Sequence, residues 1–313
     1  MVSTLFKWGS FVKLSHTVFA LPFALASMVV AARETKGWPG ARIFLLVLVA
    51  MVCARTCAMA FNRIVDRKFD ALNPRTKKRP LITGEISLAS AVALCGLSAA
   101  GFVAAAWGLN PLCFKLSPVA LFFVCFYSLT KRFTDFTHVW LGLALALAPL
   151  GAWLAVEGQF NWLPEVAGQT GLGALRFGAF VPLTLALAVT LWLIGFDIIY
   201  ATQDFEFDRQ HGLHSLVVRW GPMNALSIAF LAHLFMWAAL ALFGALCAFR
   251  LAYWIGLTLI LGLLLLEHFI ARRRRDPVSI NVAFFKLNGV ISCIFLAVTV
   301  SEVVFPWFRL RWY

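Results

Sequence analysis

Long apolar segments alternate with short polar ones along most of the chain. Nine segments of about twenty residues carry few charges and are predicted to be helices: residues 14–32, 42–61, 87–107, 111–130, 138–156, 179–203, 223–246, 250–270 and 284–305. A helix of roughly 20 apolar residues is long enough to cross the hydrocarbon core of a bilayer. The pattern therefore predicts an all-α, polytopic membrane protein with nine transmembrane helices.

The composition supports a membrane protein. Of the 313 residues, 62% are hydrophobic and 13% are charged. Soluble domains are roughly half apolar and about a quarter charged, and in water this excess would expose large apolar patches. A soluble enzyme, a disordered chain and a small disulfide scaffold are thus excluded. The seven cysteines lie almost all within apolar segments and form no CxxC pair, so we interpret them as small buried hydrophobic residues.

The net charge of +13 is explained by topology. With a cytoplasmic N-terminus, 18 of the 27 Lys and Arg residues fall in cytoplasmic segments, eight fall on the other side, and Arg55 lies within a span. Cytoplasmic loops of membrane proteins carry an excess of Lys and Arg. We therefore predict an N-in, C-out orientation, with the lipid bilayer as the partner of the basic surplus and no role for nucleic acid.

A first cluster of acidic residues ends the second predicted span. Asn62, Asp66 and Asp70 are spaced four residues apart and therefore share one face of a helix, with Arg55 on the same face. Carboxylate and amide oxygens suit Mg²⁺, which completes its shell with substrate phosphates. The following basic residues would supply counter-charge for an anion: Arg67, Lys68, Arg75, Lys77, Lys78 and Arg79.

A second cluster repeats this spacing at the end of the sixth span. Tyr200, Asp204 and Asp208 superpose on the first motif after a shift of 138 residues, and Asp197 lies one turn before Tyr200. The repeat predicts two pseudo-repeated halves, about 1–137 and 138–313, that face one another across a central site. Lys131 and Arg132 emerge on the same side of the membrane. His211 and His214 have no nearby thiolate and make a weak zinc motif.

On these motifs the chain resembles the UbiA superfamily of intramembrane aromatic prenyltransferases. The resemblance spans nearly the whole chain and also includes the basic segment 74–81 and the loop from Tyr127 to Arg132. It implies nine transmembrane helices around a central cavity, a Mg²⁺-bound polyprenyl diphosphate, and prenylation of an aromatic acid in quinone biosynthesis. It also implies an active site on the cytoplasmic side of a bacterial inner membrane.

The resemblance assigns roles to individual positions. The implied metal ligands are Asn62, Asp66, Asp70, Asp204 and Asp208, and the four aspartates with Asp197 form the implied catalytic set. The implied substrate-binding residues are Arg55, Asn62, Arg67, Lys131, Arg132, Tyr200 and His214. Asp197 is the candidate proton acceptor.

One departure bears on the acceptor. Many 4-hydroxybenzoate prenyltransferases have Gly-x-Lys-Ser after the second motif, whereas this chain has Gly212-Leu213-His214-Ser215. That variant resembles the branch that prenylates 1,4-dihydroxy-6-naphthoate in the futalosine route to menaquinone. Both acids stay open as acceptors, and 4-hydroxybenzoate would lead to ubiquinone.

Other functions fit part of the pattern. A secondary transporter also carries paired half-motifs, but its ionisable groups tend to lie midway through broken helices rather than at span ends. A catalytically silent scaffold would not require every aspartate of both motifs. Relatives that act on haem or chlorophyllide are rivals within the enzyme class.

Overall fold

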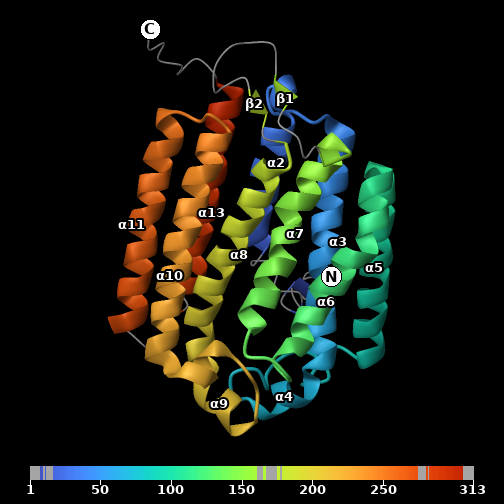
Figure 1. Ribbon diagram of the computed structural model, residues 1–313. Coiled ribbons are helices and arrows are strands. Elements are labelled where there is room, and N and C mark those ends of the chain that lie inside the picture. Colours follow the sequence, from blue (N-terminus) through green and yellow to red (C-terminus); the bar gives the residue numbers. More distant parts are fainter. Residues whose placement is uncertain are drawn as a thin grey trace.

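Within the residues that it describes, the computed structural model is helical apart from one short strand pair (Figure 1). These residues are 8–9, 11, 17–160, 165–166, 175–176, 178–273, 280 and 282–305. The helices are α2 (Thr17–Ala31), α3 (Ala41–Val65), α4 (Arg67–Leu72), α5 (Leu88–Leu109), α6 (Pro111–Thr130), α7 (Thr137–Glu157), α8 (Phe180–Ala201), α9 (Phe205–Gln210), α10 (Leu216–Leu246), α11 (Leu251–Arg273) and α13 (Asn288–Val304). Strand β1 (Glu165–Val166) pairs antiparallel with β2 (Leu175–Arg176).

The all-α, polytopic membrane architecture is confirmed. Among the described residues, eight helices are long and apolar enough to cross a membrane, and a further apolar helix over Phe19–Ala31 is shorter. The total of nine spans and the N-in orientation stay predictions. The largest difference in a boundary is at α10, which begins at Leu216 rather than near residue 223. Gly221 (φ 76°, ψ 157°) and Pro222 kink this helix, and the pattern had located only its longer, straight part.

The long helices run side by side and place the short helices α4 and α9 together at one end of the bundle (Figure 1). Helix α8 packs between α7 and α10, α3 packs against α5 and α6, and α2 packs against α7 and α13. Helix α4 follows α3 and α9 follows α8, so the two predicted acidic clusters meet at that end.

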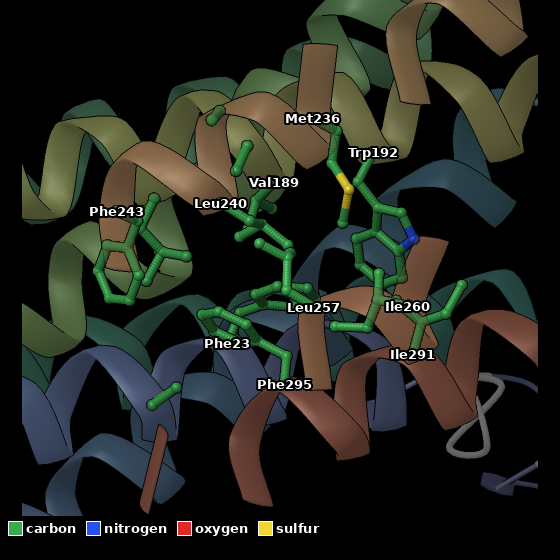
Figure 2. Close-up of a cluster of buried hydrophobic side chains, with 14 of the residues drawn as sticks. Phe23, Val189, Trp192, Met236, Leu240, Phe243, Leu257, Ile260, Ile291 and Phe295 are labelled. Atoms are coloured by element: carbon green, nitrogen blue, oxygen red, sulfur yellow. The ribbon is translucent and has the colours of Figure 1, made fainter. Parts of the chain in front are cut away.

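A large apolar core holds α2, α8, α10, α11 and α13 together. Figure 2 shows Phe23, Trp192, Phe243 and Phe295 in this cluster, all of them fully buried. Lipid tails are as apolar as these side chains, so close packing and internal hydrogen bonds hold such helices together. The Trp192 indole N–H accordingly donates to Asn288 Oδ1 at 2.6 Å.

A close helix contact fixes the position of α8. A Cβ atom at Gly195 would lie 2.1 Å from the ring of His233 on α10, so only glycine permits this approach. Helix α8 also carries Asp197 and Tyr200, and the contact therefore sets the depth and rotation of these two side chains.

The cysteines are free thiols within the described residues, but the expectation that they are buried is only partly correct, since Cys53, Cys95, Cys113 and Cys125 are half-buried. Cys57 and Cys247 are buried, whereas Cys293 is exposed on the surface of the bundle. Cys57 Sγ lies 3.8 Å from Cys95 Sγ and 3.9 Å from Cys125 Sγ, at the contact of α3, α5 and α6.

Candidate active site

A cavity of about 260 Å³ opens at the end of the bundle where α4 and α9 meet. Its charged lining comes from both halves of the chain. The acidic members are Asp66, Asp70, Asp197, Asp204 and Asp208, and the basic members are Arg55, Arg63, Arg75, Arg79, Lys131 and Arg132. Five carboxylates thus face six cations in one confined space.

The first acidic cluster lies across a break between two helices. Helix α3 ends at Val65, Asp66 adopts φ −89° and ψ 4°, and α4 begins at the next residue. The Asp70 N–H nevertheless donates to the Asp66 carbonyl at 2.8 Å, so the four-residue spacing is kept. Asn62 Nδ2 donates to Asp66 Oδ2 at 2.8 Å, and Asp70 pairs with Arg79.

The second cluster lies on the 3-10 turn Thr202–Asp204 and on α9, where Asp204 and Asp208 are both buried. Arg75 from the loop after α4 reaches across to it. Its Nε donates to Asp204 Oδ1 at 3.0 Å and its Nη2 donates to Asp204 Oδ2 at 2.5 Å. Its Nη1 donates to the Tyr200 hydroxyl at 2.5 Å. The two halves are therefore joined by a bidentate ion pair.

The loop after α6 supplies two more cations. Lys131 Nζ lies 3.3 Å from Asp208 Oδ2, and Arg132 Nη2 lies 3.4 Å from Asp66 Oδ1. Burial opposes the charge of Lys131, but the carboxylates of Asp208, Asp204 and Asp197 outweigh it and raise the lysine pKa above its ordinary value. Lys131 therefore stays protonated at neutral pH.

The Asp66 carboxylate of the first motif is more easily protonated than an exposed one. Burial is the main cause that raises the pKa of Asp66, and the Asp70 carboxylate adds to it, while Lys131 and Arg132 oppose the shift. A bound cation would favour the charged form of such a group.

The carboxylate and amide oxygens in the lining are the kind of ligand that Mg²⁺ prefers. Among the residues that the structure describes, no three acidic, histidine or cysteine side chains converge as a ready metal site, because each of four aspartates is held by an Arg or Lys instead. Mg²⁺ is commonly bound by one or two carboxylates and completed by substrate phosphates. The lining therefore fits a metal that arrives together with an anionic substrate.

A second cavity, of about 280 Å³, adjoins the charged one. It lies among α2, α3, α5, α6 and α7 and is almost wholly apolar. The two cavities share Arg55, Tyr127, Leu141 and Leu145. Arg55 Nε is buried at this boundary and has no hydrogen-bond partner within the described part of the chain. The pair of cavities fits a ligand with an anionic head and a long apolar tail.

Most of the residues predicted from the sequence are brought together here. Ten of the twelve line the charged cavity: Arg55, Asn62, Asp66, Asp70, Lys131, Arg132, Asp197, Tyr200, Asp204 and Asp208. Arg67 and His214 do not line it, and their contact with substrate stays a prediction. Arg67 is exposed on α4. His214 Nδ1 lies 3.1 Å from Asp135 Oδ1, and the His214 N–H donates to the Lys131 carbonyl at 2.7 Å.

Sequence reasoning missed several lining or supporting residues. Arg63 and Asn73 are buried at the first motif, and Asn73 Nδ2 donates to Asp204 Oδ1 at 3.3 Å. His138, fully buried at the start of α7, places Nδ1 2.6 Å from Asp197 Oδ2. Arg63 and Asn73 follow the second predicted span and His138 begins the fifth, so neither the hydropathy pattern nor the four-residue spacing distinguished them.

Comparison with known proteins finds one family and several relatives along most of the chain. A profile described as "UbiA prenyltransferase family" matches residues 20–290. A 4-hydroxybenzoate octaprenyltransferase of Methylobacillus flagellatus is 30% identical over 280 residues, covering 86% of this chain and 84% of the relative. A protein of the same name from Shewanella woodyi is 30% identical over 287 residues, covering 90% of each chain.

Solved structures share the fold. The apo structure of a UbiA homologue from Aeropyrum pernix K1 superposes with a TM-score of 0.78 at 31% identity, covering 92% of this chain and 98% of that one. A UbiA homologue from Archaeoglobus fulgidus, solved with GPP and Mg²⁺ bound, superposes with a TM-score of 0.69 at 23% identity, covering 95% and 99%.

Proposed function

Because the chain belongs to the UbiA prenyltransferase family, we propose that it transfers a polyprenyl group from a polyprenyl diphosphate to an aromatic acid in respiratory quinone biosynthesis, with Mg²⁺ as cofactor. The observation that carries the proposal is the charged cavity that adjoins an apolar one. The names of the relatives support an aromatic acid acceptor. The GPP and Mg²⁺ in the Archaeoglobus fulgidus homologue support the donor and the metal.

The charged cavity would bind the diphosphate. Held by oxygens of Asn62, Asp66, Asp70, Asp204 and Asp208, Mg²⁺ would neutralise charge that develops on the leaving diphosphate. Lys131 and Arg132 lie beside these carboxylates and would donate to phosphate oxygens. Such donors accelerate the reaction most when they are already in place as the allylic carbon–oxygen bond breaks.

The apolar parts of the site would control the rest of the reaction. The second cavity would take the polyprenyl tail. Leu193 and Phe196 line the inner wall of the charged cavity and would keep water from the allylic cation. The unpartnered Arg55 Nε at the boundary would donate to the carboxylate of the acceptor acid.

The acceptor is expected to be 1,4-dihydroxy-6-naphthoate in preference to 4-hydroxybenzoate. His214 does not reach the cavity, but it ties the Lys131 backbone to the segment after α9, so its effect would come through the position of Lys131. Purified membranes supplied with labelled prenyl diphosphate, Mg²⁺ and both acids at equal concentration give the preference as a ratio of kcat/KM. A ratio that favours 4-hydroxybenzoate would contradict this expectation and leave the prenyl transfer intact. Absence of prenylated product with either acid would contradict the proposed function.

The orientation is expected to be N-in and C-out in a bacterial inner membrane, with nine spans and the charged cavity facing the cytoplasm. Single cysteines at exposed positions 77 and 210 lie at the end that carries α4 and α9, and position 250 lies between α10 and α11 at the other end. In a variant without the native cysteines, an impermeant thiol reagent added to intact cells should label position 250 alone. All three should react after permeabilisation. Labelling at 77 or 210 in sealed cells would reverse the assignment.

A further inference from the structure

Asp197 and His138 form a buried hydrogen-bonded pair at the inner wall of the charged cavity. His138 Nδ1 lies 2.6 Å from Asp197 Oδ2, and the imidazole is completely buried. The Asp197 side chain is 20% exposed and lines the cavity, whereas His138 does not line it. The histidine therefore stands behind the carboxylate, and only the carboxylate can meet a ligand.

The surroundings of His138 determine its tautomer. His138 Nε2 is buried and has no hydrogen-bond partner among the described residues. A proton on Nε2 would leave a buried N–H without an acceptor, which is costly. The neutral form that carries its proton on Nδ1 avoids this cost and donates to Asp197 Oδ2. The imidazole thus fixes the rotamer of the Asp197 carboxyl group.

Asp197 lies deeper in the bundle than the carboxylates proposed to hold the metal. It precedes Asp204 by seven residues, which corresponds to about 10 Å along a helix. At that depth it lies beside Leu193 and Phe196 on the same helix. Its carboxylate adds to the negative charge that favours the protonated form of Lys131. This position suits a base that acts on the acceptor ring rather than on the diphosphate.

We infer that His138 is a positioning residue that holds Asp197 as the base that removes the ring proton of the aromatic acceptor. The inference rests on the proposed function. In the reaction, the allylic carbon–oxygen bond breaks and its electron pair leaves with the diphosphate. A carbon–carbon bond then forms with the electrons of the ring. The ring carbon–hydrogen bond breaks last, its electron pair restores aromaticity, and the proton passes to the free oxygen of Asp197.

Deuterium on the acceptor ring provides a test that a merely structural role would not affect. Wild-type kcat should be the same with ring-deuterated and ordinary acid, because ionisation and carbon–carbon bond formation limit the rate. His138→Ala should lower kcat about 10- to 100-fold with little change in KM for the prenyl diphosphate. A deuterium effect above unity should appear in this variant, because loss of the proton becomes slow. The deuterated and ordinary acids are assayed in separate reactions and compared by kcat. A competition between them would compare kcat/KM, which reports only the steps up to the first irreversible one.

Three further variants separate positioning from folding. Asp197→Asn should lose about 10²-fold or more of kcat and should also show the deuterium effect. His138→Asn keeps a side-chain N–H near Nδ1 and should recover much of the rate. His268→Asn is the matched control, because His268 on α11 is also a buried imidazole with one ring nitrogen, Nδ1, that has no partner among the described residues, and it does not line the cavity. Its deuterium effect should stay at unity even if less protein folds, because the effect is a ratio within one preparation.

The outcomes are distinct. A deuterium effect of unity in both His138→Ala and Asp197→Asn would overturn the inference and direct the proton elsewhere, such as to a diphosphate oxygen. A deuterium effect in His268→Asn would overturn it too, because general loosening of the bundle would then suffice. Wild-type protein that forms no prenylated acid would remove the proposed function together with this inference.

Discussion

Asp66→Ala and Asp204→Ala should each reduce prenyl transfer by about 10²- to 10³-fold, the loss seen when one charge-stabilising group is removed from a transition state. Asp66 is bonded by Asn62 and lies beside Arg132, and Asp204 is bonded by Arg75 and Asn73. Each substitution removes an oxygen ligand proposed for Mg²⁺ and releases a cation. The released arginines are each about one third exposed and can be hydrated, so the fold should survive.

The measurement is initial rate against Mg²⁺ concentration, with helix content followed by circular dichroism in detergent. Asp135→Ala is the matched control. Asp135 is also an ion-paired carboxylate at this end of the bundle, 2.7 Å from Arg219, but it does not line the cavity. The control should keep most of the activity. Near-normal turnover of Asp66→Ala or Asp204→Ala at saturating Mg²⁺ would show that the residue is not a ligand.

Removal of Mg²⁺ should abolish turnover and should also weaken prenyl diphosphate binding. When neither Mg²⁺ nor diphosphate is bound, the five carboxylates of the cavity are already balanced by its six cationic side chains. The metal alone would have to compete with arginines for the carboxylates, and the diphosphate alone would have to compete with carboxylates for the arginines. Together they bring nearly compensating charges. We therefore expect each to raise the affinity of the other by about 5- to 150-fold, the usual range for coupled sites.

Thermal unfolding in detergent measures this coupling. A non-hydrolysable prenyl diphosphate analogue and Mg²⁺ should each raise the Tm slightly when added alone and should raise it by more than the sum when added together. EDTA should reverse the joint effect. Strictly additive shifts would show that metal and diphosphate bind independently and would contradict the shared site.

The membrane fold was predictable because hydropathy reports it directly. Eight apolar segments became long helices whose ends, apart from the start of α10, lie close to the predicted ones, and the motifs at the ends of α3 and α8 line one cavity. The candidate metal ligands could be proposed from the sequence because they recur at every fourth residue, and the helical hydrogen bond from the Asp70 N–H to the Asp66 carbonyl keeps them on one side across the break at Asp66. These features are local in sequence, so a single chain contains the information.

Contacts between the halves were not predictable in this way. Arg75 and Asp204 are 129 residues apart, and His138 and Asp197 are 59 apart. Which basic residue of the loop after α4 pairs with which carboxylate depends on how the helices pack. The same limit explains Arg67 and His214, whose charge and motif position fit an anion site but whose side chains lie elsewhere. The kink at Gly221 likewise reflects backbone geometry that hydropathy does not record.

The boundary between the two cavities matters for the design of inhibitors. A compound that imitates the diphosphate needs many negative charges to satisfy the arginines, and such compounds cross membranes poorly. Arg55 lines both cavities, and its buried Nε is unpartnered among the described residues. A lipophilic molecule anchored in the apolar cavity, with one carboxylate reaching Arg55, would block the tail of the donor and the acid group of the acceptor at once. It would do so with a single charge.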